Sequence, residues 1–394
     1  MIIFKPKKSI FLLVLTLFLL FFVFSFCEAA TLYLMPQSQN IYQEDSLIID
    51  LRIDTESEEI NTAEVNLNFS SDLFEIVEFN KGDSIFTFWP EEPESKDNII
   101  SFMGGVPGGF QGTGSLLKIN LRAKETGQTI IFFKNNSRVL LNDGKGTLAE
   151  LSLSQGNYKV SKKPEGLIVI SSRNCPDQNK WYSSTTLHIQ WDLIEGAEYS
   201  YVLSRDPLAE PDETADSPEG ELMWMGDMEY DLKTEGDWVY YFTLRQRLLG
   251  EDWSKEISRF RAMIDSTPPE DFKPEIGQES SVFEGKYFLN FTAQDKTSGI
   301  DHYEVTELTK TFWVFTSKEQ WETVKSPYLL KDQRLKSKIL VKAVDKAGNN
   351  RIAQILPAYK IGWEDVAFLV ILFLIIRGVI WWLRKKIQRK KYNQ

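Results

Sequence analysis

The acidic and amide residues that could bind a metal ion occur in two segments of the last third of the chain. Asp295 lies within residues 293–300, and Asp345 and Asn349 lie within residues 341–350. Clustered carboxylate and amide oxygens are what Ca²⁺ requires, so these three side chains are candidate calcium ligands. Asp and Asn also suit turns, because their side chains bond to the neighbouring backbone. The pattern therefore allows a calcium site or turn residues, and turns are the simpler interpretation.

Three aromatic residues in the first third of the chain are candidates for ligand binding. Phe86, Phe88 and Trp89 are followed by Pro90. Alternation along an extended strand predicts that Phe86 and Phe88 lie on one face. Exposed aromatic rings stack on sugar rings or anchor a protein interface. The alternative is that Phe86 and Phe88 fill a core while Trp89 covers an edge.

Catalytic chemistry has few candidates in this sequence. The two histidines, His188 and His302, adjoin core-facing positions and are predicted to face solvent. Cys27 belongs to a predicted leader, so Cys175 would be the one cysteine of the mature chain. These residues suit neither a zinc site nor a Ser-His-Asp triad, and no phosphate-binding or nucleophile-elbow motif occurs. Carboxylates are plentiful, but no pair is singled out for glycosidic chemistry. We therefore predict no catalytic residues, no cofactor and no enzymatic activity.

Residues 1–30 have the pattern of a signal peptide. Lys5, Lys7 and Lys8 precede an apolar run over residues 10–26, and two alanines follow at 29–30. A basic region, an apolar region and small residues at a cleavage site are the features of a secretory signal. An uncleaved anchor is the alternative, because the apolar run is long. Both interpretations place the next segment outside the cell.

Residues 366–383 form a second apolar stretch, near the C-terminus. About 18 residues at a rise of about 1.5 Å each cover about 27 Å, enough to cross a hydrocarbon core. A tryptophan pair suits the membrane interface, and the basic tail 384–394 is expected in the cytoplasm under the positive-inside rule. The predicted anchor residues are Val366, Arg377, Trp381, Trp382, Leu383, Arg384, Lys385 and Lys386. We expect a single-pass membrane protein with extracellular N-terminal modules; a buried core helix is the alternative.

Arg377 is a charged residue inside this apolar stretch. A charge within a membrane is costly and often functional. Arg377 lies about two helical turns from the basic tail, so its side chain can extend toward that tail. Contact with a partner helix is the alternative.

The chain between the two apolar segments is acidic and rich in aromatic residues. The formal net charge is −11 even though basic residues gather in the leader and the tail, and 13% of residues are aromatic. An acidic exterior argues against nucleic acid and anionic glycans as partners. The aromatic content argues against a disordered stalk.

Residues 31–160 have the pattern of β-strands. Apolar and polar residues alternate within 46–53, 63–69 and 114–123, and glycine-rich turns such as Gly104-Gly105 separate such segments. A period of two with one apolar face is typical of strands in a sandwich.

The order of these segments resembles a cohesin module over about a third of the chain. The matching landmarks are 46–53, 63–69, 71–77, Gly82-Asp83, 99–102, 114–123 and 139–147. The resemblance implies a jelly-roll-like sandwich that binds a dockerin-like protein partner. Because several carbohydrate-binding modules share this sandwich, it also allows a polysaccharide ligand. No local motif identifies contact residues.

Two further modules are expected before the anchor. In residues 162–266, alternation places Trp191 in a core, and the strand near Tyr240 with the Trp253-Ser254 segment resembles a fibronectin type III domain. Residues 206–221, rich in Pro, Asp and Glu, are predicted to form a mobile loop. A proline pair at 268–269 marks a boundary. Residues 267–362 then resemble a bacterial immunoglobulin-like domain, through 293–300 and 341–350.

The fold class expected is all-β, with tandem β-sandwich modules and one C-terminal transmembrane helix. The predicted function is noncovalent binding at the cell surface, with the first module binding a dockerin-like or other surface protein. Polysaccharide binding through the same fold, in connection with polysaccharide breakdown, is the alternative, and a purely structural spacer is a third. A flat apolar sheet face would favour a protein, whereas a groove of coplanar aromatic rings would favour a glycan.

Overall fold

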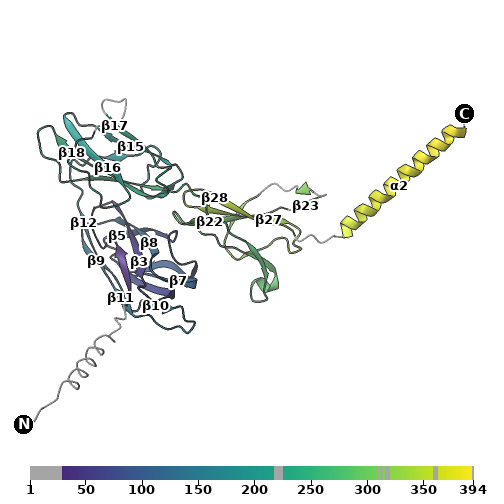
Figure 1. The fold of residues 1–394 in the computed structure, drawn as a ribbon, viewed down its shortest axis with the longest axis horizontal. Helices are drawn as coiled ribbons and strands as arrows, with labels where there is room; N and C mark the ends of the chain where they lie inside the picture. Colours follow the sequence, from purple (N-terminus) through teal and green to yellow (C-terminus); the bar gives the residue numbers. More distant parts are fainter. Residues whose placement is uncertain are drawn as a thin grey trace, which may run out of the picture. The chain divides into compact units, whose positions relative to one another are not determined.

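The computed structural model describes residues 29–216, 225–308, 310–311, 314–315, 320–357 and 363–392. Most of these residues lie in β-strands of several sheets, and a long helix follows the last strand (Figure 1). The all-β prediction with a C-terminal apolar helix is confirmed. The predicted signal peptide lies outside the described residues except for its last two positions.

The chain forms two compact units. The first contains residues up to Glu270 together with Ala293–Asp301 and Val344–Arg351, and the second contains Asp271–Thr292, His302–Ala343 and the chain from Ile352 onward. The first unit holds two hydrophobic cores, and the second unit holds a third. Two segments from the last third of the chain, which carry Asp295 and Asp345, therefore belong to the first unit.

The first core lies between two sheets. One has the strand order β11-β1-β3-β8-β5, and the other has the order β2-β12-β9-β4-β7-β6, with β10 paired to β4. The strands are β1 (Ala30–Met35), β2 (Ser38–Tyr42), β3 (Ser46–Asp54), β4 (Ile60–Asn68), β5 (Phe74–Asn80), β6 (Phe88–Lys96), β7 (Ile99–Phe110), β8 (Thr113–Ala123), β9 (Gly127–Phe133), β10 (Arg138–Leu141), β11 (Leu151–Leu153) and β12 (Gly156–Ser161).

Alternation along these strands explains how the core forms. In β3, Leu47, Ile49, Leu51 and Ile53 are buried, while the residues between them are half-buried on the other face. Strand β4 shows the same alternation. Each strand therefore contributes one apolar face to the space between the sheets.

The second core is built from β13-β15-β17 and β14-β19-β18-β16. These strands are β13 (Ile170–Ser171), β14 (Trp181–Tyr182), β15 (Thr186–Asp192), β16 (Ala197–Ser204), β17 (Met225–Asp231), β18 (Trp238–Leu248) and β19 (Ser258–Ile264). Trp191 is buried at its centre, as predicted, and lies 5.7 Å from Phe242 between ring centroids. Gly226 faces this indole, because a Cβ there would lie 2.2 Å from the Trp191 ring. Figure 1 shows β15–β18 grouped apart from the strands of the first core.

The third core is smaller. Its sheets are β20-β21-β26 and β25-β22-β27-β28, and β23 pairs with β24. The elements are β20 (Glu275–Gln278), the 3-10 turn η1 (Phe283–Gly285), β21 (Tyr287–Asn290), β22 (Ile300–Leu308), β23 (Lys310–Thr311), β24 (Val314–Phe315), β25 (Glu322–Val324), β26 (Tyr328–Leu329), β27 (Lys338–Asp345) and β28 (Asn350–Ile355). Leu289, Phe291, Val305 and Val341 are buried there.

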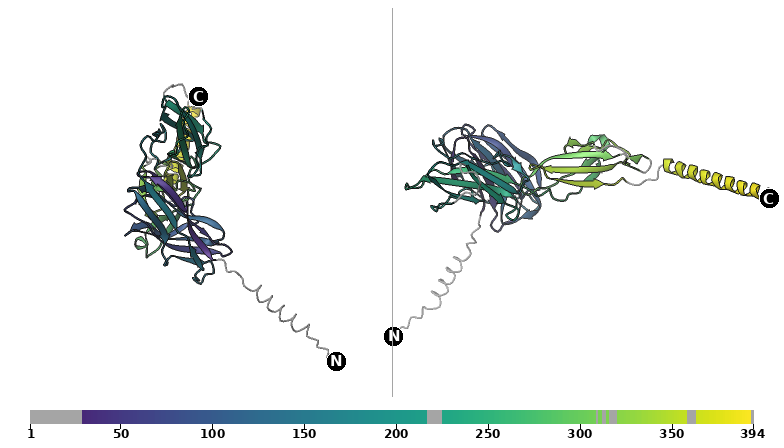
Figure 2. Two further views of the ribbon diagram at one scale, coloured as in Figure 1. Left: turned by 90° about the vertical axis from the view of Figure 1, so that its left-hand side faces the viewer. Right: turned by 90° about the horizontal axis from the view of Figure 1, so that it is seen from above.

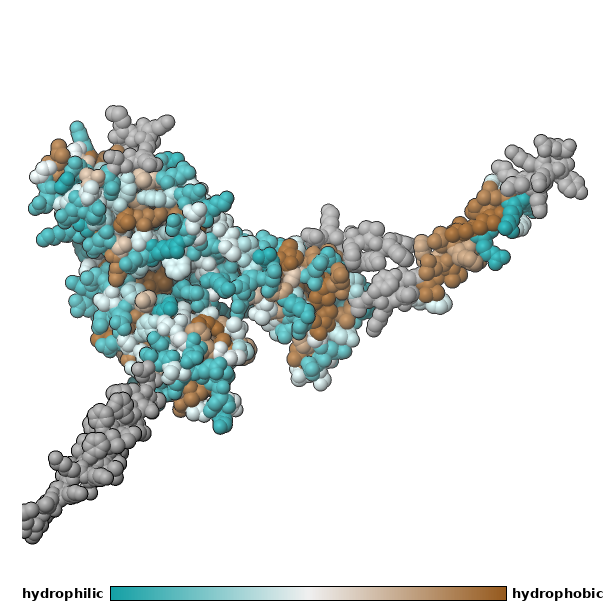
Figure 3. Space-filling model, viewed as in Figure 1, coloured by the Kyte–Doolittle hydropathy of each residue, from teal (hydrophilic) through white to brown (hydrophobic). Residues whose placement is uncertain are grey.

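The helix α2 extends over Trp363–Tyr392, and the right-hand view of Figure 2 shows it as one continuous helix. Its segment Val366–Lys385 is long and apolar enough to cross a membrane, and none of the segment is buried against the rest of the protein. Figure 3 shows the apolar surface of this helix giving way to hydrophilic residues toward its C-terminal end.

Candidate functional site

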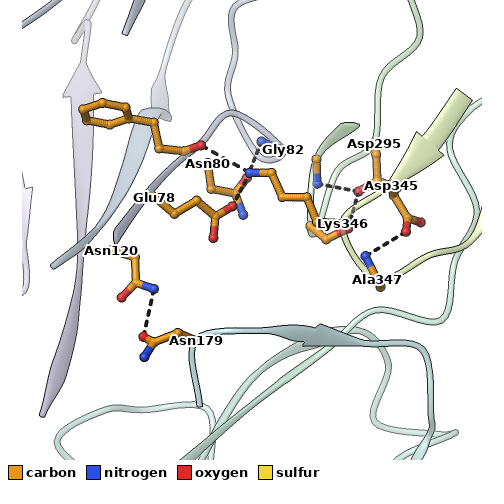
Figure 4. A network of polar contacts seen from close by, with 12 residues as sticks. Glu78, Asn80, Gly82, Asn120, Asn179, Asp295, Asp345, Lys346 and Ala347 are labelled. Atoms are coloured by element: carbon orange, nitrogen blue, oxygen red, sulfur yellow. Dashed lines mark hydrogen bonds and ion pairs between the residues drawn. The ribbon is translucent and has the colours of Figure 1, made fainter. Parts of the chain in front are cut away.

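The outer face of the five-stranded sheet is covered within the first unit. Arg261 of β19 is buried, and its guanidinium donates to Asn120 Oδ1 on β8 at 3.1 Å and to Asn179 Oδ1 at 2.6 Å. Asn120 also donates to Asn179, at 3.3 Å. On β5, Glu78 forms an ion pair with Lys346 (Figure 4). This face is therefore unavailable to a large partner.

The outer face of the other sheet is exposed on β9. Ile131 and Phe133 are buried in the core, whereas Ile130 and Phe132 are 46% and 41% exposed on the opposite face. Two large apolar side chains on the solvent face of one strand depart from the usual alternation of apolar and polar residues. They mark this sheet as the accessible face of the first module.

Strand register extends this surface across the sheet. Phe132 on β9 pairs with Asn68 on β4, Asn68 pairs with Ile99 on β7, and Ile99 pairs with Lys96 on β6. The neighbouring row pairs Asn66 on β4 with Ser101 on β7. Small polar side chains thus lie between the apolar ones. We call the outward-facing residues of β9, β4, β7 and β6 the exposed sheet face.

A hollow of about 480 Å³ adjoins this face on the β10 side. Glu64 and Arg138 form an ion pair at its wall, and the 57% exposed Leu148 lines it as well. Arg138 and Glu64 are register partners on β10 and β4, so the hollow continues the exposed sheet face.

The aromatic residues near position 88 do not act together. Phe86 is 3% exposed in the first core, and Phe88 is 61% exposed at the start of β6. The prediction that they lie on one face is wrong, because the chain bends at residues 85 and 87 and β6 begins only at Phe88. Trp89 is half-buried and packs edge-on against Phe86, at 5.6 Å and 88°. Its ring is also tilted by 49° to that of the buried Phe102, so this cluster offers no coplanar platform.

Three aspartates converge in the first unit. Asp265, Asp295 and Asp345 are all buried, and one carboxylate oxygen of each lies within 4.8 Å of the others. Two of these residues, Asp295 and Asp345, were candidate ligands from the sequence. Asp265 was not; its place beside the proline pair indicated only a boundary.

Backbone donors hold these carboxylates in place. Asp295 Oδ1 accepts from the N–H groups of Thr297 and Gly299, at 3.2 and 2.8 Å. Asp345 Oδ1 accepts from the N–H groups of Ala347 and Asn349, at 2.9 and 2.8 Å (Figure 4). These contacts are what the turn interpretation expects of aspartate.

Asn349 enters the cluster as a donor. Its amide nitrogen donates to Asp345 Oδ2 at 2.9 Å and to the backbone oxygen of Asp265 at 2.8 Å. These bonds hold the turn of residues 345–349 and join it to Asp265. These contacts use the amide nitrogen, so a ligand role for the Asn349 amide oxygen stays a prediction.

Burial and mutual repulsion affect protonation in this cluster. Burial, together with the charges of Asp295 and Asp345, raises the pKa of Asp265 to about 7. Burial also raises the pKa of Asp345. A divalent cation would relieve the repulsion, and these three carboxylates are the described groups that could supply its oxygen ligands. Calcium takes about six to eight oxygens, so backbone carbonyls or water would have to complete the shell.

The residues considered for catalysis have structural surroundings. His188 Nδ1 lies 3.6 Å from Glu229, and His302 Nε2 lies 3.7 Å from Glu304. Cys175 is buried in the second core, and burial raises the pKa of its thiol to about 11. A protonated, inaccessible thiol is a poor nucleophile.

The predicted anchor residues all lie in α2. Val366, Arg377, Trp381, Trp382, Leu383, Arg384 and Lys385 have exposed side chains, and Lys386 follows in the same helix. The Lys385 ammonium lies 4.8 Å from the centroid of the Trp381 ring. An apolar segment thus ends in a tryptophan pair and a basic flank.

Comparison with known proteins gives structural similarities only. No family model matches the chain, and no curated protein matches it. A non-cellulosomal cohesin from Archaeoglobus fulgidus is 13% identical, with a TM-score of 0.30, covering 35% of this chain and 94% of that one. The third ScaB cohesin of R. flavefaciens, solved in complex with a group 1 dockerin, is 13% identical, with a TM-score of 0.28, and covers 34% and 96%. A putative membrane anchored protein from Corynebacterium diphtheriae is 9% identical, with a TM-score of 0.20, and covers 83% and 89%.

Proposed function

We propose that this protein is a membrane-anchored surface protein that binds a partner protein noncovalently through the exposed sheet face. The observation that carries the proposal is the pair Ile130 and Phe132, which β9 presents to solvent although both are large and apolar. Binding removes such surface from water and is favourable for that reason. The proposed activity is noncovalent recognition, with no chemical turnover.

The composition of the exposed sheet face favours a protein ligand. Apolar side chains at Ile130, Phe132 and Phe88 are separated by the amides of Asn66 and Asn68. A mixture of apolar anchors and polar groups is usual in non-obligate protein interfaces. The tilted, partly buried rings around Trp89 lack the coplanar arrangement that a glycan would favour.

The proposed partner is a dockerin-like module. This choice rests on the cohesin-like order of segments in the sequence. Polysaccharide binding by the same module is the second candidate, and the observation in its favour is the 61% exposed ring of Phe88 on edge strand β6.

We also propose the orientation and the module boundaries. Residues 31–160 form the binding module, 162–266 and 267–362 form two spacer modules, and α2 anchors the chain with residues 384–394 in the cytoplasm. The basic residues that follow the apolar segment of α2 favour this orientation.

The test is a capture experiment with the full chain in lipid nanodiscs. The immobilised protein is offered the secreted proteins of the host, a panel of dockerin-like modules and an array of polysaccharides. Ile130→Asp is compared with Ile352→Asp. These isoleucines are matched, because both lie on strands and are 46% and 48% exposed, but Ile352 is on β28.

A dockerin-like module that binds the wild type should bind Ile130→Asp at least tenfold more weakly, since one buried anchor is commonly worth over about 1.4 kcal/mol. Ile352→Asp should bind as the wild type does. Equal losses in both variants, or no loss in Ile130→Asp, would exclude this face as the binding site. Capture of a polysaccharide alone would replace the proposal with its second candidate.

A further inference from the structure

A cavity of about 310 Å³ lies within the first unit, over the covered face of the five-stranded sheet. Its floor is formed by Ile48 and Asp50 of β3 and by Lys118 and Asn120 of β8. Register pairs Ile48 with Asn120 and Asp50 with Lys118, so the floor is a small block of adjacent side chains. Small-molecule pockets have volumes of about 300–1,000 Å³, and this cavity lies at the lower end of that range.

Aromatic and apolar walls come from the outer face of the sheet β14-β19-β18-β16. Trp181 of β14, Trp238 of β18 and Met263 of β19 line the cavity. Trp181 is only 5% exposed, whereas Trp238 is 46% exposed. An indole that is half in solvent at the wall of a cavity offers apolar surface that a ligand can cover.

Cationic side chains flank this exposed indole. The Lys118 ammonium lies 5.8 Å from the Trp238 ring centroid, and the Arg205 guanidinium carbon lies 5.5 Å from it. Cation–π attraction at these distances helps to hold the ring in one orientation. Lys118 is also paired with Asp83, at 3.0 Å. The aromatic wall is therefore preorganised by charged neighbours that also offer hydrogen bonds.

The charges around the cavity balance. The charged lining residues are the acids Asp50, Glu78 and Asp83 and the bases Lys118, Arg205 and Lys296. Most of these groups are already paired, as Lys296 is with Glu270 at 2.6 Å. Balanced, paired charges provide no net attraction for an ion, but they provide many donors and acceptors. The lining therefore suits a polar ligand without net charge.

We propose that this cavity binds a neutral saccharide, with one sugar ring stacked on Trp238. A sugar ring combines an apolar face of C–H groups with a rim of hydroxyls. The apolar face would stack on the Trp238 ring. The hydroxyls would form hydrogen bonds with the Asp83–Lys118 pair, Asn80 and Asn120.

This saccharide site is independent of the proposed protein-binding surface. The cavity lies over the sheet that contains β3 and β8, whereas the exposed sheet face belongs to β9, β4, β7 and β6. The two sites use opposite faces of one sandwich. Loss of either activity should leave the other unchanged.

The test measures sugar binding by the full chain in lipid nanodiscs, which avoid detergents with sugar head groups. Glucose, galactose, mannose, N-acetylglucosamine, cellobiose and glucuronic acid are titrated, with saturation-transfer NMR and calorimetry as readouts. The variants are Trp238→Ala, Trp238→Phe and, as an exposed aromatic outside both proposed sites, Phe283→Ala. Trp238 is half exposed, so its replacement should leave the fold intact.

We expect saturable binding of at least one neutral sugar, weakened at least tenfold in Trp238→Ala, weakened less in Trp238→Phe and unchanged in Phe283→Ala. Binding that survives Trp238→Ala, or that both alanine variants reduce equally, would overturn the assignment to this cavity. Binding of glucuronic acid and of no neutral sugar would overturn the proposal that the ligand is neutral. Absence of binding by every sugar at tens of millimolar would overturn the saccharide proposal.

Discussion

Asp295→Asn should stabilise the loop of residues 295–299. Asp295 Oδ1 accepts the N–H groups of Thr297 and Gly299 and lies 3.4 Å from the Ser298 hydroxyl. An asparagine retains an oxygen for these contacts. It removes one negative charge from a buried group of three and places an N–H donor beside the two that remain.

The size of the effect follows from the separation of the carboxylates. The carboxylate oxygens lie within 4.8 Å of one another. Two unit charges at that limit repel by about 3.5 kcal/mol at an effective dielectric constant of about 20. Asp295 takes part in two such pairs, with Asp265 and Asp345. Relaxation of the loop and proton uptake already reduce this repulsion in the wild type, so we expect a net gain of about 1–3 kcal/mol at pH 8.

The gain should depend on pH in a defined direction. Burial and the neighbouring charges raise the pKa of Asp265 to about 7, above its ordinary value of 3.8. For an acid whose folded pKa is raised, the stability that protonation provides is lost as pH rises from about 4 to about 7. At pH 5 Asp265 holds its proton and the repulsion is smaller. Asp295→Asn should therefore stabilise the loop more at pH 8 than at pH 5.

Hydrogen exchange measured by mass spectrometry is the suitable assay, because a protein with several cores has no single unfolding free energy. Variant and wild type are compared at equal pH with EGTA present. Peptides covering 295–299 should exchange about 5 to 150 times more slowly in Asp295→Asn at pH 8, which corresponds to about 1–3 kcal/mol. Asp72→Asn, a change at an exposed carboxylate, should leave this loop unchanged.

Faster exchange in Asp295→Asn at pH 8 in EGTA would refute the repulsion on which the prediction rests. A second arm with calcium tests the three carboxylates as ligands. Calcium that protects this loop in the wild type and fails to protect it in Asp295→Asn would identify a cation site. Equal exchange rates in calcium and in EGTA would show that these carboxylates act only as turn residues.

Three further predictions concern the buried groups of the first unit. Gly226→Ala should destabilise the second core by about 1–3 kcal/mol, since its Cβ would lie 2.2 Å from Trp191, and a lower midpoint of tryptophan-monitored unfolding would show this. Cys175 should resist iodoacetamide at pH 8 until denaturant is added, because burial raises its pKa to about 11; full labelling of the native protein would contradict this. Arg261→Met should cost about 1–3 kcal/mol, because Asn179 and Asn120 lose its charged donors, and an unchanged unfolding midpoint would argue against these bonds.

Local pattern was sufficient for much of the fold. The alternation in 46–53 and 63–69 predicted β3 and β4 and their buried faces, because side chains of an extended chain point to opposite sides in turn. The same rule failed at Phe86 and Phe88, because the chain bends at residues 85 and 87 and β6 begins only at Phe88. Apolar–polar alternation identifies a regular strand, but it does not show where the chain bends.

The candidate sites depended more on contacts between distant residues. Asp295 and Asp345 could be selected by residue type, but Asp265 joins them only because two segments fold back into the first unit. The exposure of Ile130 and Phe132 could not be inferred from their apolar character, which would equally suit a core. Likewise, Trp181 and Trp238 line one cavity with Lys118, a residue of another sandwich.

The sequence by itself determined the strands, their apolar faces and the apolar helix, because backbone geometry and the transfer of apolar side chains from water act over a few neighbouring residues. Only the tertiary structure decided which sheet face is covered by Arg261 and Lys346, which face stays open at β9, and which carboxylates meet. Those outcomes depend on packing between elements far apart in the chain. One such contact excludes another, and no short stretch of sequence shows which of them forms.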